Sequence, residues 1–286
     1  MTEFTAEVLP VRADDDHGWE LLAWIPEEVK STLLWLPAMG IAAKHYRPFA
    51  EAMAARGVAT FVHEWRGNGS SKRRASRQQD WGYAELLDLD LPASESAIAE
   101  RLPDVVRVIG GHSLGWQLAC CRLALAPPSA QRLWLVATGS PYWRAFPASS
   151  RYWLPLVYRF LPWLADRRGV LPGRRLGFAG QEARGVIHDW ARTALSGRYA
   201  AARLETDLER AMQSLDVDVA AVLMRHDWFA PLSSLRFLLS KLGHSQARVD
   251  VLDDAALGAR ADHFEWMKQP EPVVARLVAT GKLETS

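Results

Sequence analysis

The sequence predicts an α/β protein with a mostly parallel, doubly wound central sheet, helices on both faces of that sheet and a helical cap insertion. Two observations favour this fold class. Short apolar runs rich in β-branched residues alternate with helical segments, which is typical of parallel sheets covered on both sides. Between residues 142 and 215 the alternation stops, since this stretch has aromatic and proline-broken helical patches and no convincing strand.

Each expected element follows from its own local pattern. Strands are expected at residues 4–11, 19–25, 31–36, 58–63, 105–109, 132–137, 217–224 and 248–252. Helices are expected at residues 46–56, 83–101, 233–242 and 272–280, and another after residue 113 to about residue 125. Pro92 should kink or break the second of these helices. Residues 1–140 and 216–286 are therefore expected to form the core domain, and residues 141–215 the cap.

Composition narrows the class of partner and compartment. The 286 residues carry a net charge of only +1, which gives no global reason to expect a nucleic-acid partner. The only two cysteines, Cys120 and Cys121, are adjacent, so they cannot form a disulfide framework that links distant parts of the chain. A reduced cytoplasmic setting is therefore expected. The first residues show no signal-peptide pattern, and no apolar run is long enough to span a bilayer.

One short motif carries the chemistry. The apolar run 105–109 leads into Gly111-His112-Ser113-Leu114-Gly115, and a helical segment follows directly. Gly-x-Ser-x-Gly between a strand and a helix is a nucleophile elbow, which lifts a serine hydroxyl above the edge of the sheet. The two glycines are expected because a Cβ at either position would collide with the neighbouring strand or helix. Ser113 is thus the candidate nucleophile.

A serine nucleophile needs a base and an acid that orients it, and in this architecture they follow in the chain order Ser, Asp, His. Asp227 follows the strand expected at 217–224, and His263 lies in the loop after the last expected strand. His244 is a weaker rival for the base because it precedes that strand. The rival acids are Asp250, Asp253 and Asp254, which lie within the last expected strand or after it.

Two backbone amides should stabilise the oxyanion. One is the amide of Leu114, at the start of the helix after the elbow. The other is expected from Met39, in the loop that follows the strand 31–36. The aromatic residues expected to bind substrate are Trp116, Tyr142, Trp143 and Trp228.

Three stretches resemble the α/β-hydrolase fold family. They are the elbow, the loop Trp35-Leu36-Pro37-Ala38-Met39-Gly40 and the turn Glu64-Trp65-Arg66-Gly67-Asn68-Gly69-Ser70-Ser71. Many members have His-Gly where this chain has Pro37-Ala38, and Asp where it has Glu64. In the cap, Gly169-Val170-Leu171-Pro172-Gly173, Gly177 and Asp189-Trp190 are similar to a bacterial branch known mainly as predicted hydrolases. The resemblance implies a hydrolase and identifies no substrate.

Other motifs have structural interpretations. Arg66, Gly67 and Gly69 are expected to fix a turn, since no dinucleotide or Walker fingerprint accompanies them. No cluster of histidine, cysteine and carboxylate residues has metal-ligand spacing, so neither a metal nor another cofactor is expected. The aromatic run 152–163 has three interpretations: cap core, an acyl-binding pocket, or contact with a membrane interface, which the sequence favours least.

These observations predict a serine hydrolase that cleaves a carboxylic ester or thioester with a hydrophobic acyl or aryl group. Its partner is then a small-molecule ester or thioester. Three alternatives stay open: an acyltransferase with the same residues, an aminopeptidase-like amide hydrolase, and a non-catalytic binding protein on this scaffold.

Overall fold

The computed structural model describes residues 3–177 and 179–279, in which eight strands form one sheet in the order β1-β2-β4-β3-β5-β6-β9-β10. β1 pairs antiparallel with β2 and β2 with β4, whereas all later neighbours are parallel. The strands are β1 (Phe4–Arg12), β2 (Gly18–Pro26), β3 (Ser31–Leu36), β4 (Val58–Val62), β5 (Arg107–His112), β6 (Arg132–Val136), β9 (Asp218–Met224) and β10 (Gln246–Leu252). The predicted fold class is confirmed.

Two apolar cores lie on the two faces of this sheet. Successive residues of a strand point to opposite faces, so Leu33 and Trp35 of β3 enter one core and Leu34 and Leu36 the other. α1 (Arg47–Ala54), α11 (Asp254–Leu257) and α12 (Glu271–Val278) cover the first face. α3 (Leu91–Arg101), α4 (Leu114–Leu125), α9 (Leu208–Gln213) and α10 (Leu232–Leu239) cover the second. This double cover explains why the central strands are almost entirely buried and mostly apolar.

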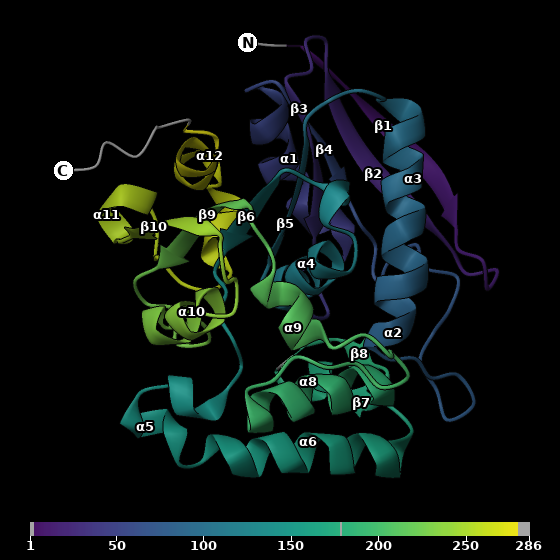
Figure 1. Ribbon diagram of the computed structural model, residues 1–286, viewed down its shortest axis with the longest axis vertical. Helices are drawn as coiled ribbons and strands as arrows, with labels where there is room; N and C mark the ends of the chain where they lie inside the picture. The colour runs from purple at the N-terminus through teal and green to yellow at the C-terminus, as the bar shows by residue number, and fades with distance from the viewer. Residues whose placement is uncertain (1–2, 178, 280–286) are drawn as a thin grey trace.

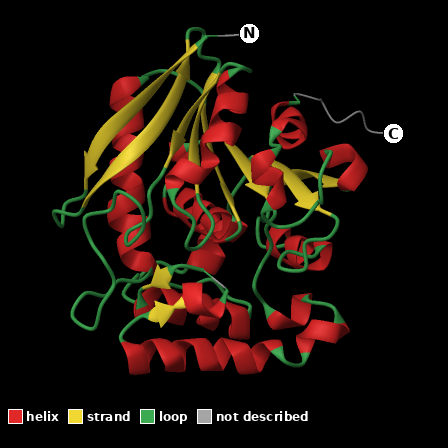
Figure 2. Ribbon diagram, turned by 180° about the vertical axis from the view of Figure 1, so that it is seen from behind, coloured by secondary structure: helices red, strands yellow, loops and turns green. Residues whose placement is uncertain are grey.

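A helical insertion separates β6 from β9. It contains α5 (Ala148–Arg151), α6 (Leu154–Arg168), α7 (Gly173–Leu176) and α8 (Arg184–Ser196). Figure 1 shows α6 across the end of the molecule opposite the N-terminus, with α8 between α6 and the sheet, and the reverse view of Figure 2 agrees. Contrary to expectation, the insertion holds one strand pair, β7 (Leu171–Pro172) with β8 (Gln181–Glu182). Two paired residues per strand are too few to leave an alternating pattern in the sequence.

The helix expected at 83–101 is uninterrupted in the structure, and a π-helical turn directly before Leu91 and Pro92 stands where a kink or break was expected. α2 (Tyr83–Glu85) passes into a π-helical turn (Leu86–Asp90), and α3 begins one residue before the proline. The Leu91 N–H donates to the Leu86 carbonyl oxygen, and the next residue, Pro92, has no N–H to donate, so the regular bonding of the helix changes at this point. Within the described residues, no helix is both long and apolar enough to cross a membrane.

Candidate active site

The strand–turn–helix around Ser113 has the geometry of a nucleophile elbow. β5 ends at His112, α4 begins at Leu114, and Ser113 between them has φ 54° and ψ −118°. Positive φ is strained for a residue with a Cβ, so the surrounding structure must hold it. One such restraint is the Thr138 hydroxyl, which donates a hydrogen bond to the Ser113 carbonyl oxygen at 2.8 Å.

The flanking glycines are required by close backbone contacts. A Cβ on Gly115 would lie 2.0 Å from the carbonyl oxygen of Leu36, and one on Gly111 would lie 2.7 Å from the same oxygen. Both distances are far below van der Waals contact. The predicted collision is therefore confirmed, and it arises because α4 passes directly over the end of β3.

A buried histidine–carboxylate pair lies beside the elbow. His263 donates from Nδ1 to Asp227 Oδ2 at 2.7 Å. The other carboxylate oxygen of Asp227 accepts the backbone N–H groups of Phe229 (2.9 Å) and Ala230 (3.1 Å). Because Asp227 occupies Nδ1, the lone pair of the neutral imidazole is on Nε2. The pair is thus built so that one ring nitrogen can accept a proton.

His112 brings this pair close to Ser113. Its ring centroid lies 4.8 Å from that of His263, and Ser113 is the next residue in the chain. Burial, together with the neighbouring His263, holds the pKa of His112 well below its usual value. The His112 ring is therefore neutral near pH 7, and its Nδ1 accepts the hydroxyl hydrogen of Tyr46 at 2.9 Å.

The rival residues have other partners. His244 is exposed, and its backbone N–H donates to the Leu215 carbonyl oxygen. Asp253 caps α11 by accepting the Ala256 N–H, and Asp254 accepts the N–H of Ala261. Asp250 lies 3.5 Å from Arg248 on the same strand. Of the four candidate carboxylates, Asp227 is the one bonded to His263.

The loop after β3 lies beside the elbow. Met39 and Leu114, the two residues expected to stabilise an oxyanion, line one cavity together with Ser113. The loop is anchored on both sides of Met39: the Ala38 N–H donates to the Tyr46 hydroxyl, and Gly40 has φ 76°. A Cβ on Gly40 would lie 2.0 Å from the backbone nitrogen of Gly180, so the insertion closes directly over this loop.

The turn after β4 is structural. Glu64 accepts the backbone N–H groups of Ala43 and Ser70, and burial raises its pKa. Arg66 is buried and forms ion pairs with Asp90 at 2.5 Å and Asp15 at 2.7 Å. These contacts hold the turn in place. Within the described part of the chain, no group of histidine, cysteine and carboxylate side chains is arranged to hold a metal ion.

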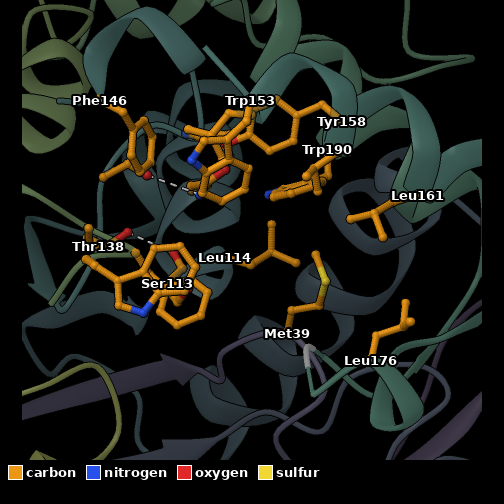
Figure 3. Close-up of a pocket in the computed structure, with 18 of the residues that line it drawn as sticks. Met39, Ser113, Leu114, Thr138, Phe146, Trp153, Tyr158, Leu161, Leu176 and Trp190 are labelled. Carbon is orange, nitrogen blue, oxygen red and sulfur yellow. Dashed lines mark hydrogen bonds between the residues drawn. The ribbon is translucent and has the colours of Figure 1, made fainter. Parts of the chain in front are cut away.

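Ser113 opens into an apolar cavity of about 400 Å³ between the sheet and the insertion. Figure 3 shows Phe146, Trp153, Tyr158, Leu161 and Trp190 around it, opposite Met39 and Leu114. No described residue that lines the cavity carries a charged side chain. On α6, Leu154, Tyr158 and Leu161 face it at intervals of three or four residues, which is the helical period of the run 152–163.

The structure brings together only some of the residues expected to bind substrate. Trp228 lines the cavity. Trp116 is fully buried in the core behind the elbow, so it forms no part of the cavity wall. Tyr142 packs on Phe237 and Trp143 donates to the Leu195 carbonyl oxygen, and neither is among the described lining residues. Sequence reasoning missed Trp190, because its contact with the cavity depends on how α8 is placed.

Comparisons with known proteins agree with this architecture. A family described as serine aminopeptidase, S33, matches residues 27–253. An esterase from Pyrococcus furiosus is 15% identical, with a TM-score of 0.58 over 96% of this chain and 90% of that one. N-formylmaleamic acid deformylase from Pseudomonas putida S16 is 17% identical, with a TM-score of 0.58 over 94% and 99%.

A third solved structure, the thioesterase domain from the curacin biosynthetic pathway, is 15% identical, with a TM-score of 0.57 over 95% of this chain and 99% of that one. At such identities the likeness concerns the fold. No curated protein sequence matches the chain.

Proposed function

The chain belongs to the serine aminopeptidase S33 family and has the α/β-hydrolase fold, and from this premise we propose that it hydrolyses a carboxylic ester or thioester with a hydrophobic acyl or aryl group. One observation carries the proposal. The strained Ser113 backbone opens into an uncharged apolar cavity, one residue away from a histidine that contacts the imidazole of His263.

In the proposed reaction, Ser113 Oγ attacks the acyl carbonyl carbon while His263 Nε2 accepts the hydroxyl proton. Asp227 orients the ring and stabilises the imidazolium through the 2.7 Å bond. The amides of Met39 and Leu114 donate to the oxyanion, and each such donor lowers the barrier by about 3–4 kcal/mol. His263 returns the proton to the departing alcohol or thiol, and water then attacks the acyl-enzyme by the same route.

The cavity lining supports an ester substrate over the amino-terminal end of a peptide. A substrate ammonium group needs a carboxylate or another strong acceptor once it is removed from water. The described lining residues include no carboxylate, whereas Phe146, Tyr158 and Trp190 offer a broad apolar surface. We therefore expect p-nitrophenyl esters with apolar acyl groups to be turned over faster than aminoacyl amides.

Replacement of Ser113 tests the nucleophile. A fluorophosphonate probe should label the wild-type protein once per chain, and Ser113→Ala should abolish both labelling and ester hydrolysis. We expect a loss of turnover of about 10³-fold or more, because the acyl-enzyme cannot form. Labelling is read by intact-mass spectrometry, and hydrolysis by p-nitrophenol release.

Ser233→Ala is the matched control, since Ser233 donates to the Ala145 carbonyl oxygen and does not line the cavity. It should keep both labelling and turnover. Unchanged ester hydrolysis in the Ser113→Ala protein would refute the proposed function.

A further inference from the structure

The outer face of α6 exposes apolar side chains to solvent. Leu156, Phe160 and Trp163 recur on α6 at intervals of three or four residues, so they lie on one side of the helix. Together with Tyr152, two residues before the helix begins, they define the α6 face. In chain order from Tyr152 to Trp163, their exposed fractions are 75%, 69%, 49% and 54%. In both views α6 is the outermost element at its end of the molecule (Figures 1 and 2). A group of exposed apolar side chains of this kind is typical of an interaction site.

The segment that contains α6 is rich in arginine. Residues 144–175 contain seven arginines and one aspartate, although the whole chain has a net charge of only +1. The aspartate, Asp166, lies 2.9 Å from His188 of α8. Among the described residues, no carboxylate lies within ion-pair distance of these arginines. Arg167 stacks over the Trp163 ring. A negatively charged partner would therefore be attracted to the α6 face.

The α6 face is continuous with the cavity above Ser113. Trp153 and Phe160 line the cavity and are also 42% and 49% exposed. Figure 3 shows Trp153 and Tyr158 around the space over Ser113 and Leu114. α6 thus contributes to both the cavity wall and the exposed apolar surface, and Phe160 belongs to both. A partner bound at the α6 face sits at the rim of the cavity.

We propose that the α6 face docks onto a membrane surface rich in anionic phospholipid. Arg159 and Arg167 would contact lipid headgroups, while Leu156, Phe160 and Trp163 enter the boundary of the acyl chains, where tryptophan is favoured. α6 lies in the plane of the membrane in this arrangement. The docking does not depend on the proposed hydrolysis.

Two other occupants fit less well. A second copy of the chain would bring two arginine-rich surfaces together, with one aspartate on each to offset them. An acidic protein would match the charge, but it offers no reason for an apolar cavity to open at the same rim. Lipid matches both features, since its headgroup is anionic and its acyl chains are apolar.

Vesicle binding tests the proposal with the full-length protein. We expect co-sedimentation with phosphatidylcholine vesicles that contain about 30% phosphatidylglycerol, and little with phosphatidylcholine alone. Raising NaCl from about 0.1 M to about 0.5 M should weaken binding, because salt screens the arginines. Arg159→Gln with Arg167→Gln should lower partitioning about 30-fold, and Leu156→Ser with Trp163→Ser about tenfold or more.

Matched controls separate docking from general surface changes. Val8→Ser with Val251→Ser removes exposed apolar groups on the edge strands β1 and β10, and Arg12→Gln with Arg260→Gln removes two exposed charges outside the insertion. Both control proteins should bind vesicles as the wild type does. The two double variants of the α6 face change Leu156 and Trp163 or Arg159 and Arg167, and none of these residues lines the cavity. Both variants should therefore hydrolyse a dissolved short-chain ester as the wild type does.

Three outcomes would overturn the proposal: no binding to anionic vesicles, binding that the α6 variants leave intact, or a dimer that those variants dissociate. Vesicle binding without detectable ester hydrolysis would support the docking and count against the proposed function. The two inferences can therefore fail separately.

Discussion

Tyr46 joins two parts of the candidate site through its hydroxyl group. Its oxygen accepts the Ala38 N–H at 2.9 Å, beside Met39, and its hydrogen is donated to His112 Nδ1 at 2.9 Å, beside Ser113. Complete burial raises the pKa of Tyr46, so the hydroxyl stays protonated and able to donate. One side chain thus sets the spacing between the loop after β3 and the elbow.

Tyr46→Phe should lower kcat for ester hydrolysis about tenfold, with little change in KM. The substitution leaves the Ala38 amide and His112 Nδ1 without this partner, which costs about 1–3 kcal/mol of stability and loosens the predicted oxyanion donors. Steady-state kinetics on a p-nitrophenyl ester and thermal melts measure the two effects.

Tyr152→Phe is the matched control, because Tyr152 is 75% exposed, and it should leave kcat and thermal stability unchanged. A Tyr46→Phe protein that is destabilised but keeps its full kcat would show that Tyr46 has only a structural role.

At the scale of elements, a buried ion pair ties α9 to the segment after α10. Lys241 Nζ lies 2.9 and 2.8 Å from the two carboxylate oxygens of Glu209, and both side chains are 10% exposed. Glu209 also accepts the Tyr199 N–H at 2.7 Å. The pair therefore holds the return of the chain from the insertion to the sheet.

Glu209→Ala should destabilise the protein by about 3–5 kcal/mol, because it leaves the Lys241 ammonium buried without its counter-ion. Urea unfolding, followed by tryptophan fluorescence, gives the change in the free energy of unfolding.

The double variant Glu209→Leu with Lys241→Met removes both charges and should recover most of this loss. If the stability losses caused by the two substitutions instead add up in the double variant, the two side chains act independently.

At the scale of the whole molecule, we expect the free energy of unfolding to depend on pH partly through a buried histidine. His17 stacks on Trp19 with ring centroids 5.0 Å apart, and it is 1% exposed. Burial, with a smaller effect of the Arg66 charge, lowers the pKa of His17 from 6.5 to about 4. The folded protein therefore keeps this ring neutral at pH values where the unfolded chain protonates it.

The stability that His17 contributes is fully present above pH 6.5 and is lost as pH falls toward about 4. His17→Phe removes this titration. As the pH falls between these limits, the free energy of unfolding of the wild type should therefore decrease by up to about 3 kcal/mol more than that of the variant. Urea unfolding of both proteins across this range measures the difference, and parallel pH profiles would contradict the assignment.

Much of the fold could be predicted from the chain because the strands are short and local in pattern. The strand expected at 31–36 has those bounds in the structure, and the others differ by a few residues at their ends. α11 was not expected, because its four residues are too few for a helical period. α9 lies within the range expected for the cap but packs with α4 in the core, since helical patterns do not say which neighbour a helix meets.

The sequence by itself determined the elbow, the chain order of Ser113, Asp227 and His263, and the alternation that builds a parallel sheet. These features depend on residue type and spacing along the chain. The catalytic roles of the three residues remain predictions, which the 2.7 Å bond between His263 and Asp227 supports.

Only the tertiary structure decided which aromatic residues meet the cavity and which meet solvent. Trp116 is buried behind the elbow, Trp190 lines the cavity, and Trp163 is exposed on α6, although all three are tryptophans on helices. The physical reason is that burial depends on which side of a helix meets its neighbours. That side is set by how the insertion packs over the sheet, which the local pattern of residues does not encode.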